Sequence, residues 1–180
     1  LLPGRYGDVL GFSSHIRASD VIELTNQARA GSGLQPLQQN QALTDAAYAK
    51  GHDMLAKQYW AHTAPDGTTP WTFIKASGYS YQVAGENLAR DFIIGSEVVD
   101  AWLASPTHRA NLMNPRYTDI GIGVIDGTLE GVETTLVVQM FGKPQQQTAL
   151  TPQVESARTD EPLAGASGQL EVTIQNEQQR

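Results

Sequence analysis

Three titratable side chains stand out in the sequence, His62, Glu86 and His108. They lie in three short stretches, YWAHTAPDG, AGENLAR and WLASPTHRANLMN, whose other residues fit a protein core or a helix cap. Two imidazoles and one carboxylate in a single cleft suit either proton transfer or the binding of a divalent metal. We therefore expect the rest of the chain to act as a scaffold that brings these three residues together.

The surroundings of the two histidines differ. His108 follows Pro106 by two residues, in the first turn of a predicted helix. The partial positive charge at a helix N-terminus favours the neutral imidazole, which is the form that binds a metal or accepts a proton. His62 lies in a predicted loop, ahead of the turn signal Asp66-Gly67. Taken singly, each histidine also fits an ordinary role, in helix packing for His108 and on the loop surface for His62.

Glu86 fits a surface position least well of the three. It lies in a short, otherwise apolar stretch from Val83 to Leu88, where a carboxylate is unusual unless it is paired or belongs to a site. The remaining histidines, His15 and His52, are interpreted as ordinary surface residues. The sequence has no G-x-S-x-G elbow, H-E-x-x-H motif, P-loop or G-x-G-x-x-G motif, which argues against the enzyme classes that use them.

Apolar periodicity predicts a helix-rich first half followed by strands. Capping signals at the helix starts are Asp20 with Glu23, Thr69, Ser96 and Ser105. The predicted helices run from 19 to the glycines at 31 and 33, and over 40–59, 70–77, 97–104 and 106–112. The stretch 83–88 fits one strand, and 119–125 with 133–141 fit an antiparallel hairpin.

Three glycines inside these elements indicate close packing. Gly121 and Gly123 leave one face of the first hairpin strand bare, which predicts the close approach of a helix or a ligand. Gly51 interrupts the second helix at some energetic cost, so we expect another backbone to pack against it there.

Composition narrows the protein's class. The 180 residues include no cysteine, which excludes disulfides and thiolate chemistry, and are 40% apolar and 17% charged, as in ordinary globular domains. A formal net charge of −7 without a basic run argues against nucleic-acid binding. No apolar run approaches the roughly 18 residues of a membrane-spanning helix. Because residue 1 is Leu, we expect that a preceding segment was removed.

Four stretches in order resemble a known family: LTNQARAGSGLQPLQQNQALTDAAYAKGHDM, WAHTAPDG, GENLA and VVDAWLASPTHRANLMNPRYTDIGIGV. The family is the bacterial branch of the CAP superfamily, or SCP domains, related to cysteine-rich secretory, antigen five and pathogenesis-related proteins. The resemblance predicts a lead-in segment at 1–18, a CAP/SCP domain at 19–142 and a polar linker or tail at 143–180. The alternating pattern near 169–175 fits one strand within that tail.

The resemblance implies an α+β fold, a three-layer α-β-α sandwich with a small, mainly antiparallel sheet between helices. It implies that His62 and His108 are the two family histidines, which can hold a divalent metal, most often zinc, and that Glu86 is the first family acid. The second acid commonly follows the tryptophan of the fourth helix by three residues, and after Trp102 that place is taken by Ser105. A site with one carboxylate is less suited to separate acid and base roles, and two histidines leave metal positions open for water or substrate.

Three functions are compatible with this site, because a fold alone does not select one. The first is an extracytoplasmic module that binds a divalent ion or a small ligand. The second is a hydrolase of cell-envelope or peptide substrates, in which His62 and His108 hold a metal and Glu86 activates water, so that all three are candidate catalytic residues. The third is a lipid or sterol carrier. We rank the binding module first; the extracytoplasmic location follows from the export of family members, and the sequence leaves the oligomeric state open.

Overall fold

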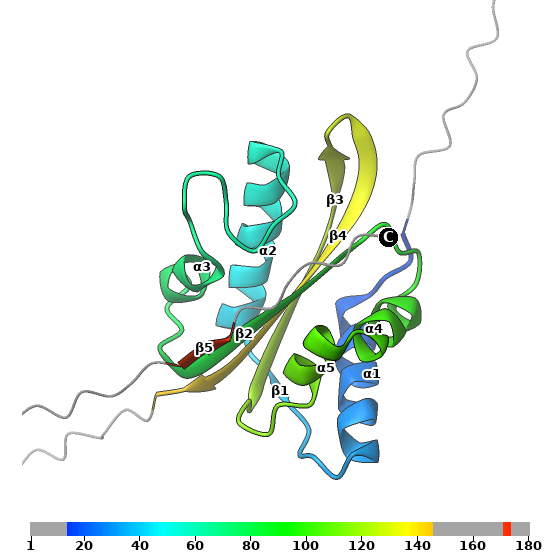
Figure 1. The fold of residues 1–180 in the computed structure, drawn as a ribbon, viewed down its shortest axis with the longest axis vertical. Helices are drawn as coiled ribbons and strands as arrows, with labels where there is room; N and C mark the ends of the chain where they lie inside the picture. The colour runs from blue at the N-terminus through cyan, green and yellow to red at the C-terminus, as the bar shows by residue number, and fades with distance from the viewer. Residues whose placement is uncertain (1–13, 146–170, 174–180) are drawn as a thin grey trace, which may run out of the picture.

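The computed structural model describes residues 14–145 and 171–173. Most of the expected lead-in segment and tail therefore lies outside the described residues. A five-stranded sheet stands between two layers of helices, with α2 and α3 on one side and α1, α4 and α5 on the other (Figure 1). The predicted α-β-α sandwich is confirmed.

All described helices precede the β3–β4 hairpin, and the strands β1 and β2 lie between them along the chain. The helices are α1 (Ala18–Gly31), α2 (Gln41–Lys57), α3 (Pro70–Ala76), α4 (Gly95–Ala104) and α5 (Pro106–Leu112). The strands are β1 (Gln38–Gln39), β2 (Tyr81–Arg90), β3 (Asp119–Leu129), β4 (Val132–Pro144) and β5 (Glu171–Thr173).

The sheet has the strand order β1-β3-β4-β2-β5. Its three long strands pair antiparallel, β3 with β4 and β4 with β2, which confirms the predicted hairpin and the predicted strand around Glu86. The two short edge strands pair parallel, β1 with β3 and β5 with β2. The sheet is therefore mixed, with an antiparallel centre.

The helix starts agree only in part with the capping signals. The side chain of Asn40, predicted only as the first residue of the second helix, caps α2, because its Oδ1 accepts hydrogen bonds from the backbone N–H groups of Ala42 and Leu43. The expected capping box at Asp20 is wrong: α1 begins at Ala18, so Asp20 lies inside the first turn and pairs with Arg17. Ser96 likewise lies inside α4, which begins at Gly95.

Two hydrophobic cores fill the spaces between the sheet and the helices. In β4, Leu136, Val138 and Met140 belong to the core under α2 and α3, whereas Val137 and Phe141 belong to the core under α1 and α4. This alternation follows from the period of two in a strand. The same alternation in β2 directs neighbouring side chains to opposite faces of the sheet.

The glycines of β3 let α2 lie directly on the sheet. A Cβ atom at Gly121 would meet the backbone of Leu43 and Thr44, and one at Gly123 would lie 2.9 Å from the carbonyl carbon of Ala47. The predicted close approach is therefore that of a helix. At Gly51 the expectation of a neighbouring backbone is wrong, because the close neighbour is the side chain of Ile125.

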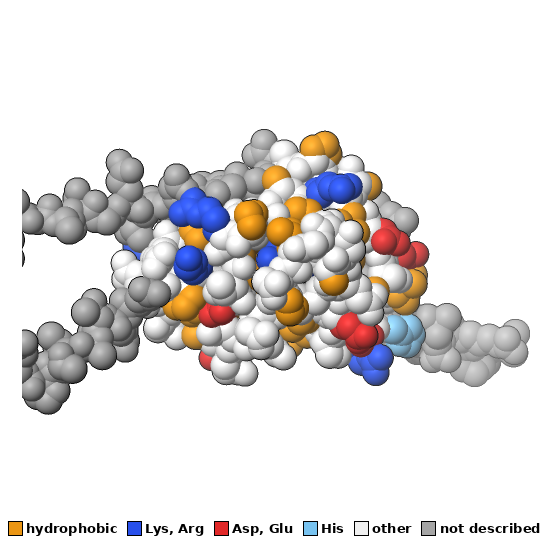
Figure 2. All heavy atoms as spheres, turned by 90° about the horizontal axis from the view of Figure 1, so that it is seen from below, with side chains coloured by type: hydrophobic (Ala, Val, Ile, Leu, Met, Phe, Trp, Pro, Cys, Tyr) orange, Lys and Arg blue, Asp and Glu red, His pale blue; other side chains and the backbone are white. Residues whose placement is uncertain are grey.

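The surface of the described part is mixed in character. On the face seen from below in Figure 2, hydrophobic side chains are scattered among polar ones, and both signs of charge occur. Within residues 14–145 and 171–173, no helix combines the length and apolarity needed to cross a membrane.

The close contact between α2 and β3 predicts the effect of adding one methyl group. Gly121→Ala places a Cβ against helix backbone that cannot move aside, and we expect the free energy of unfolding to fall by about 3 kcal/mol. Gly31→Ala is the control, because a Cβ atom at this position, at the end of α1, would meet nothing within 4 Å. Urea unfolding followed by circular dichroism measures both; equal midpoints for the two variants would contradict this packing.

Candidate functional site

The structure brings His62 and Glu86 into direct contact. His62 lies in the segment between α2 and α3, Glu86 lies in β2, and the His62 Nδ1 and Glu86 Oε1 atoms are 2.5 Å apart. The two side chains are only 6% and 1% exposed. A carboxylate so close to Nδ1 accepts the proton on that nitrogen, and therefore fixes both the tautomer and the orientation of the ring.

His108 is held in a similar way by a different partner. It is fully buried on α5, and its Nδ1 atom lies 2.8 Å from the Ser105 hydroxyl oxygen. Ser105 occupies the predicted capping position of α5, but its side chain makes no capping hydrogen bond. The interpretation of the Ser105 side chain as a helix cap is therefore wrong, since its hydroxyl is bonded to the imidazole.

The outer nitrogens of both rings are available. The Nε2 atoms of His62 and His108 are buried and have no hydrogen-bond partner within the described part of the chain. Buried polar atoms in native proteins nearly always have a partner, so two such nitrogens call for a functional explanation. A metal-binding histidine usually donates its other ring N–H to a carboxylate, a backbone carbonyl or water, and His62 with Glu86 shows this arrangement.

The electrostatics of the site keep His108 neutral. Burial, and secondarily the positive charge of His62, lower the pKa of His108 to about 4. Neutral imidazole is the form that binds a metal or accepts a proton, so His108 is in its binding-competent form at neutral pH.

The described side chains do not form a three-ligand metal site. Among residues 14–145, where side chains are described, no group of three or more His, Asp or Glu side chains is arranged to hold a metal ion. Glu86 is thus placed to orient His62. A metal bound here would rely on two protein nitrogens and would take further ligands from water or a bound molecule.

An amide network fixes α5 against β2. Asn87 donates a hydrogen bond from Nδ2 to the His108 carbonyl at 3.3 Å, and Asn111 donates from Nδ2 to the Glu86 carbonyl and to the Asn87 side chain, each at 2.9 Å. Arg29 of α1 holds the end of α5, where its Nη1 donates to the Leu112 carbonyl. The helical pattern alone places Asn111 on an exposed face, yet it is fully buried.

Lys50 holds the segment that carries His62. Its Nζ donates hydrogen bonds to the carbonyl oxygens of Ala61 and His62 at 2.8 and 2.7 Å. Sequence reasoning missed this residue. A signal was present, because Lys50 falls four residues after Ala46 and four before Met54, on the buried stripe of α2.

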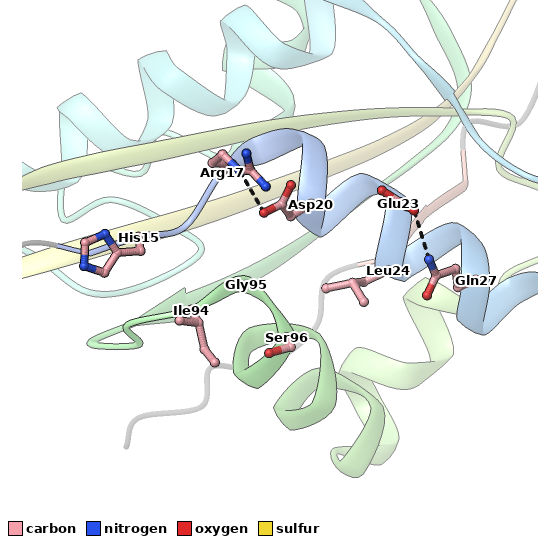
Figure 3. Close-up of a pocket in the computed structure, with 9 residues that line it drawn as sticks. All are labelled: His15, Arg17, Asp20, Glu23, Leu24, Gln27, Ile94, Gly95 and Ser96. Carbon is pink, nitrogen blue, oxygen red and sulfur yellow. Dashed lines mark hydrogen bonds and ion pairs between the residues drawn. The ribbon is translucent and has the colours of Figure 1, made fainter.

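A surface pocket of about 400 Å³ lies elsewhere, between the first turns of α1 and α4 (Figure 3). Its charged side chains already have partners, since Arg17 pairs with Asp20 at 2.9 Å and Glu23 accepts a hydrogen bond from Gln27 at 3.1 Å. The pocket contains none of His62, Glu86 and His108. The buried imidazoles are therefore the better candidate site.

Comparison with known proteins places this site in a family context. The model of the CAP, or cysteine-rich secretory protein, family matches residues 22–141. The protein YkwD of Bacillus subtilis (strain 168) is 43% identical over 106 residues, which cover 59% of this chain and 41% of YkwD. The match thus spans less than half of that relative.

Two solved structures share the fold. One is an extracellular protein containing a SCP domain from Bacillus anthracis str. Ames, with a TM-score of 0.63 and 29% identity over 70% of this chain and 40% of that one. The other is an outer surface protein of Borrelia burgdorferi, with a TM-score of 0.61 and 26% identity over 71% of this chain and 92% of that one.

The low pKa of His108 predicts a specific acid sensitivity. The unfolded chain takes up a proton on this residue near its ordinary pKa of 6.5, whereas the folded chain does so only near 4. The stabilisation is therefore complete above pH 6.5 and is lost as the pH falls from 6.5 to about 4. Between pH 7 and 4.5 we expect the wild type to lose roughly 2.5 kcal/mol more than His108→Gln.

Urea unfolding at both pH values measures this difference. His52→Gln serves as the control, because His52 is exposed on α2 and should leave the wild-type acid sensitivity unchanged. Identical acid sensitivity in His108→Gln and the wild type would contradict the burial of a neutral His108.

Proposed function

Because the chain belongs to the CAP family of cysteine-rich secretory proteins, whose model matches residues 22–141, we propose that it is an extracytoplasmic module that binds a divalent cation through His62 and His108. One observation carries this proposal: both rings present a buried Nε2 atom without a hydrogen-bond partner in the described residues. Each ring is also held at Nδ1, by Glu86 or Ser105, as metal-binding histidines usually are.

The residues present fit zinc or a similar borderline cation. Neutral imidazole nitrogen is a preferred zinc ligand, and the lowered pKa of His108 keeps that ring neutral. With two protein ligands, the cation would retain positions for water or for an anionic group of a small ligand. A bound cation would supply Lewis acidity at this place, and the chain's own residues would hold and orient the two imidazoles.

Ser105 compensates for the missing second acid. The family resemblance places a carboxylate at this position, and its replacement by Ser105 removes one candidate acid–base group. The Ser105 hydroxyl nevertheless contacts His108 Nδ1 at 2.8 Å, as the Glu86 carboxylate contacts His62 Nδ1. The substitution therefore preserves the support of the second imidazole, which favours binding over catalysis by paired carboxylates.

The alternative functions have less support from these contacts. A hydrolase with separate acid and base roles requires a second carboxylate, and Ser105 stands at the place where the family resemblance puts it, while Glu86 Oε1 contacts His62 Nδ1 at 2.5 Å. A lipid carrier requires a broad apolar surface. The large hydrophobic side chains exposed in the described residues are Tyr48, Ile93, Ile94 and Val132, which lie on three separate elements or loops.

The extracytoplasmic location is supported by the relatives. One structural relative is an extracellular SCP-domain protein, and another is an outer surface protein. Because the sequence has no cysteine, this domain folds without disulfides and its folding does not depend on an oxidising compartment.

Calorimetric titration of the metal-stripped protein with zinc at neutral pH tests the proposal. We expect one zinc per wild-type chain, binding at least ten-fold weaker in His62→Ala and in His108→Ala, and no binding in the double variant. Because the partners of the rings tune metal affinity by about 10- to 100-fold, Glu86→Gln and Ser105→Ala should weaken binding without abolishing it.

The control for this titration is the His15→Ala, His52→Ala double variant, which removes two exposed histidines. It should bind zinc as the wild type does. Zinc binding that survives loss of both His62 and His108, or that disappears in the control, would show that the proposed site is wrong.

A further inference from the structure

Lys50 is an unusual residue for the interior of this protein. It is 0% exposed on α2, although lysine is among the residues least often fully buried. An ammonium group has three N–H donors, and Nζ has three oxygen acceptors: the Tyr59 hydroxyl at 3.1 Å and the carbonyls of Ala61 and His62 at 2.8 and 2.7 Å. Burial of this group is therefore matched by specific hydrogen bonds.

Lys50 is held against α2 by Tyr59, which is itself hydrogen-bonded to Asp53 of the same helix. Nζ lies 4.7 Å from the centre of the Tyr59 ring, and the Tyr59 hydroxyl donates a hydrogen bond to Asp53 Oδ2 at 2.7 Å. Asp53 also pairs with Lys57 at 2.8 Å. Burial and the neighbouring Asp53 raise the pKa of Tyr59, so the phenol stays protonated and can donate to Asp53 while accepting from Lys50. The ammonium is thus held in one position relative to α2.

Two of the three acceptors belong to the backbone that carries the candidate ligand. The carbonyls of Ala61 and His62 lie on both sides of the His62 Cα atom, so fixing them fixes the direction in which the imidazole leaves the chain. The other histidine has a counterpart, because Asn87 donates to the His108 carbonyl. Each imidazole is therefore held twice, at its backbone carbonyl and at Nδ1.

We infer that Lys50 is the positioning residue of His62: it fixes the backbone of the loop so that the imidazole meets Glu86 with Nε2 left open. The orientation of the imidazole follows from contacts within the metal-free chain. The effect on zinc affinity rests on the proposed metal-binding function. Small displacements of a ligand-bearing backbone weaken a site strongly, since productive geometries tolerate only about 0.5 Å. A purely structural clamp would contribute to stability without affecting the imidazole.

Nitrogen–proton correlation NMR of the imidazole rings in the metal-free protein separates these roles. In the wild type, we expect His62 to show a protonated Nδ1 with a slowly exchanging proton shared with Glu86. Lys50→Met keeps the length of the side chain but removes all three donors. We expect this variant to lose the His62 signal pattern, to leave the His108 pattern unchanged, and to bind zinc at least ten-fold more weakly.

Two further variants make the test specific. Lys75→Met is the matched control, because Lys75 is an exposed lysine of α3 that lies outside the Lys50–Tyr59–Asp53 hydrogen bonds. It should leave the His62 signals and zinc affinity at wild-type values. Tyr59→Phe removes one acceptor of Lys50 and serves if Lys50→Met does not fold; it should shift the His62 signals and leave those of His108 unchanged.

The outcomes separate this inference from the proposed function. Unchanged His62 signals and zinc affinity in a folded Lys50→Met, or unchanged His62 signals in Tyr59→Phe where Lys50→Met fails to fold, would overturn the positioning role. If the wild type binds no zinc but the His62 signals still depend on Lys50, the metal proposal fails and the positioning role stands.

Discussion

The alternation of side chains along β2 is the constraint on which the site depends. Successive residues of a strand point to opposite faces, and β2 places Glu86 and Asn87 next to each other at its centre. Glu86 holds the His62 ring on the side of α2, whereas Asn87 holds the His108 carbonyl on the side of α5. One pair of adjacent residues therefore contacts both histidine-bearing segments, one on each face of the sheet.

Buried polar contacts from other elements hold the loop of His62 and the helix of His108 in place. Lys50 brings the loop after α2 to Glu86, Asn111 ties α5 to the backbone of β2, and Arg29 holds the end of α5 from α1. Unsatisfied buried polar groups are costly, so each contact stabilises one geometry over its alternatives. Within the described residues, the two histidine Nε2 atoms belong to a small set of buried atoms without a hydrogen-bond partner, which also includes Trp60 Nε1, and a bound ligand would satisfy both imidazoles.

The sequence predicts those features of the fold and site that depend on neighbouring residues. The bare glycine face of β3 and the unusual carboxylate at Glu86 could both be recognised, because each depends on a few neighbouring residues or on strand period. The partners of Ser105, Lys50 and Asn111 could not, because hydroxyl, ammonium and amide groups can bond to many acceptors. Which acceptor they meet is decided by the packing of distant elements, as between Asn111 and Glu86, 25 residues apart.

The central claim is that one cation binds to His62 and His108 together. Anomalous diffraction from crystals grown with zinc, recorded on both sides of the zinc absorption edge, tests it most directly. We expect a single strong peak about 2.0–2.1 Å from the Nε2 atoms of both rings. A peak at only one of these rings, or only at the exposed His15 or His52, would contradict it.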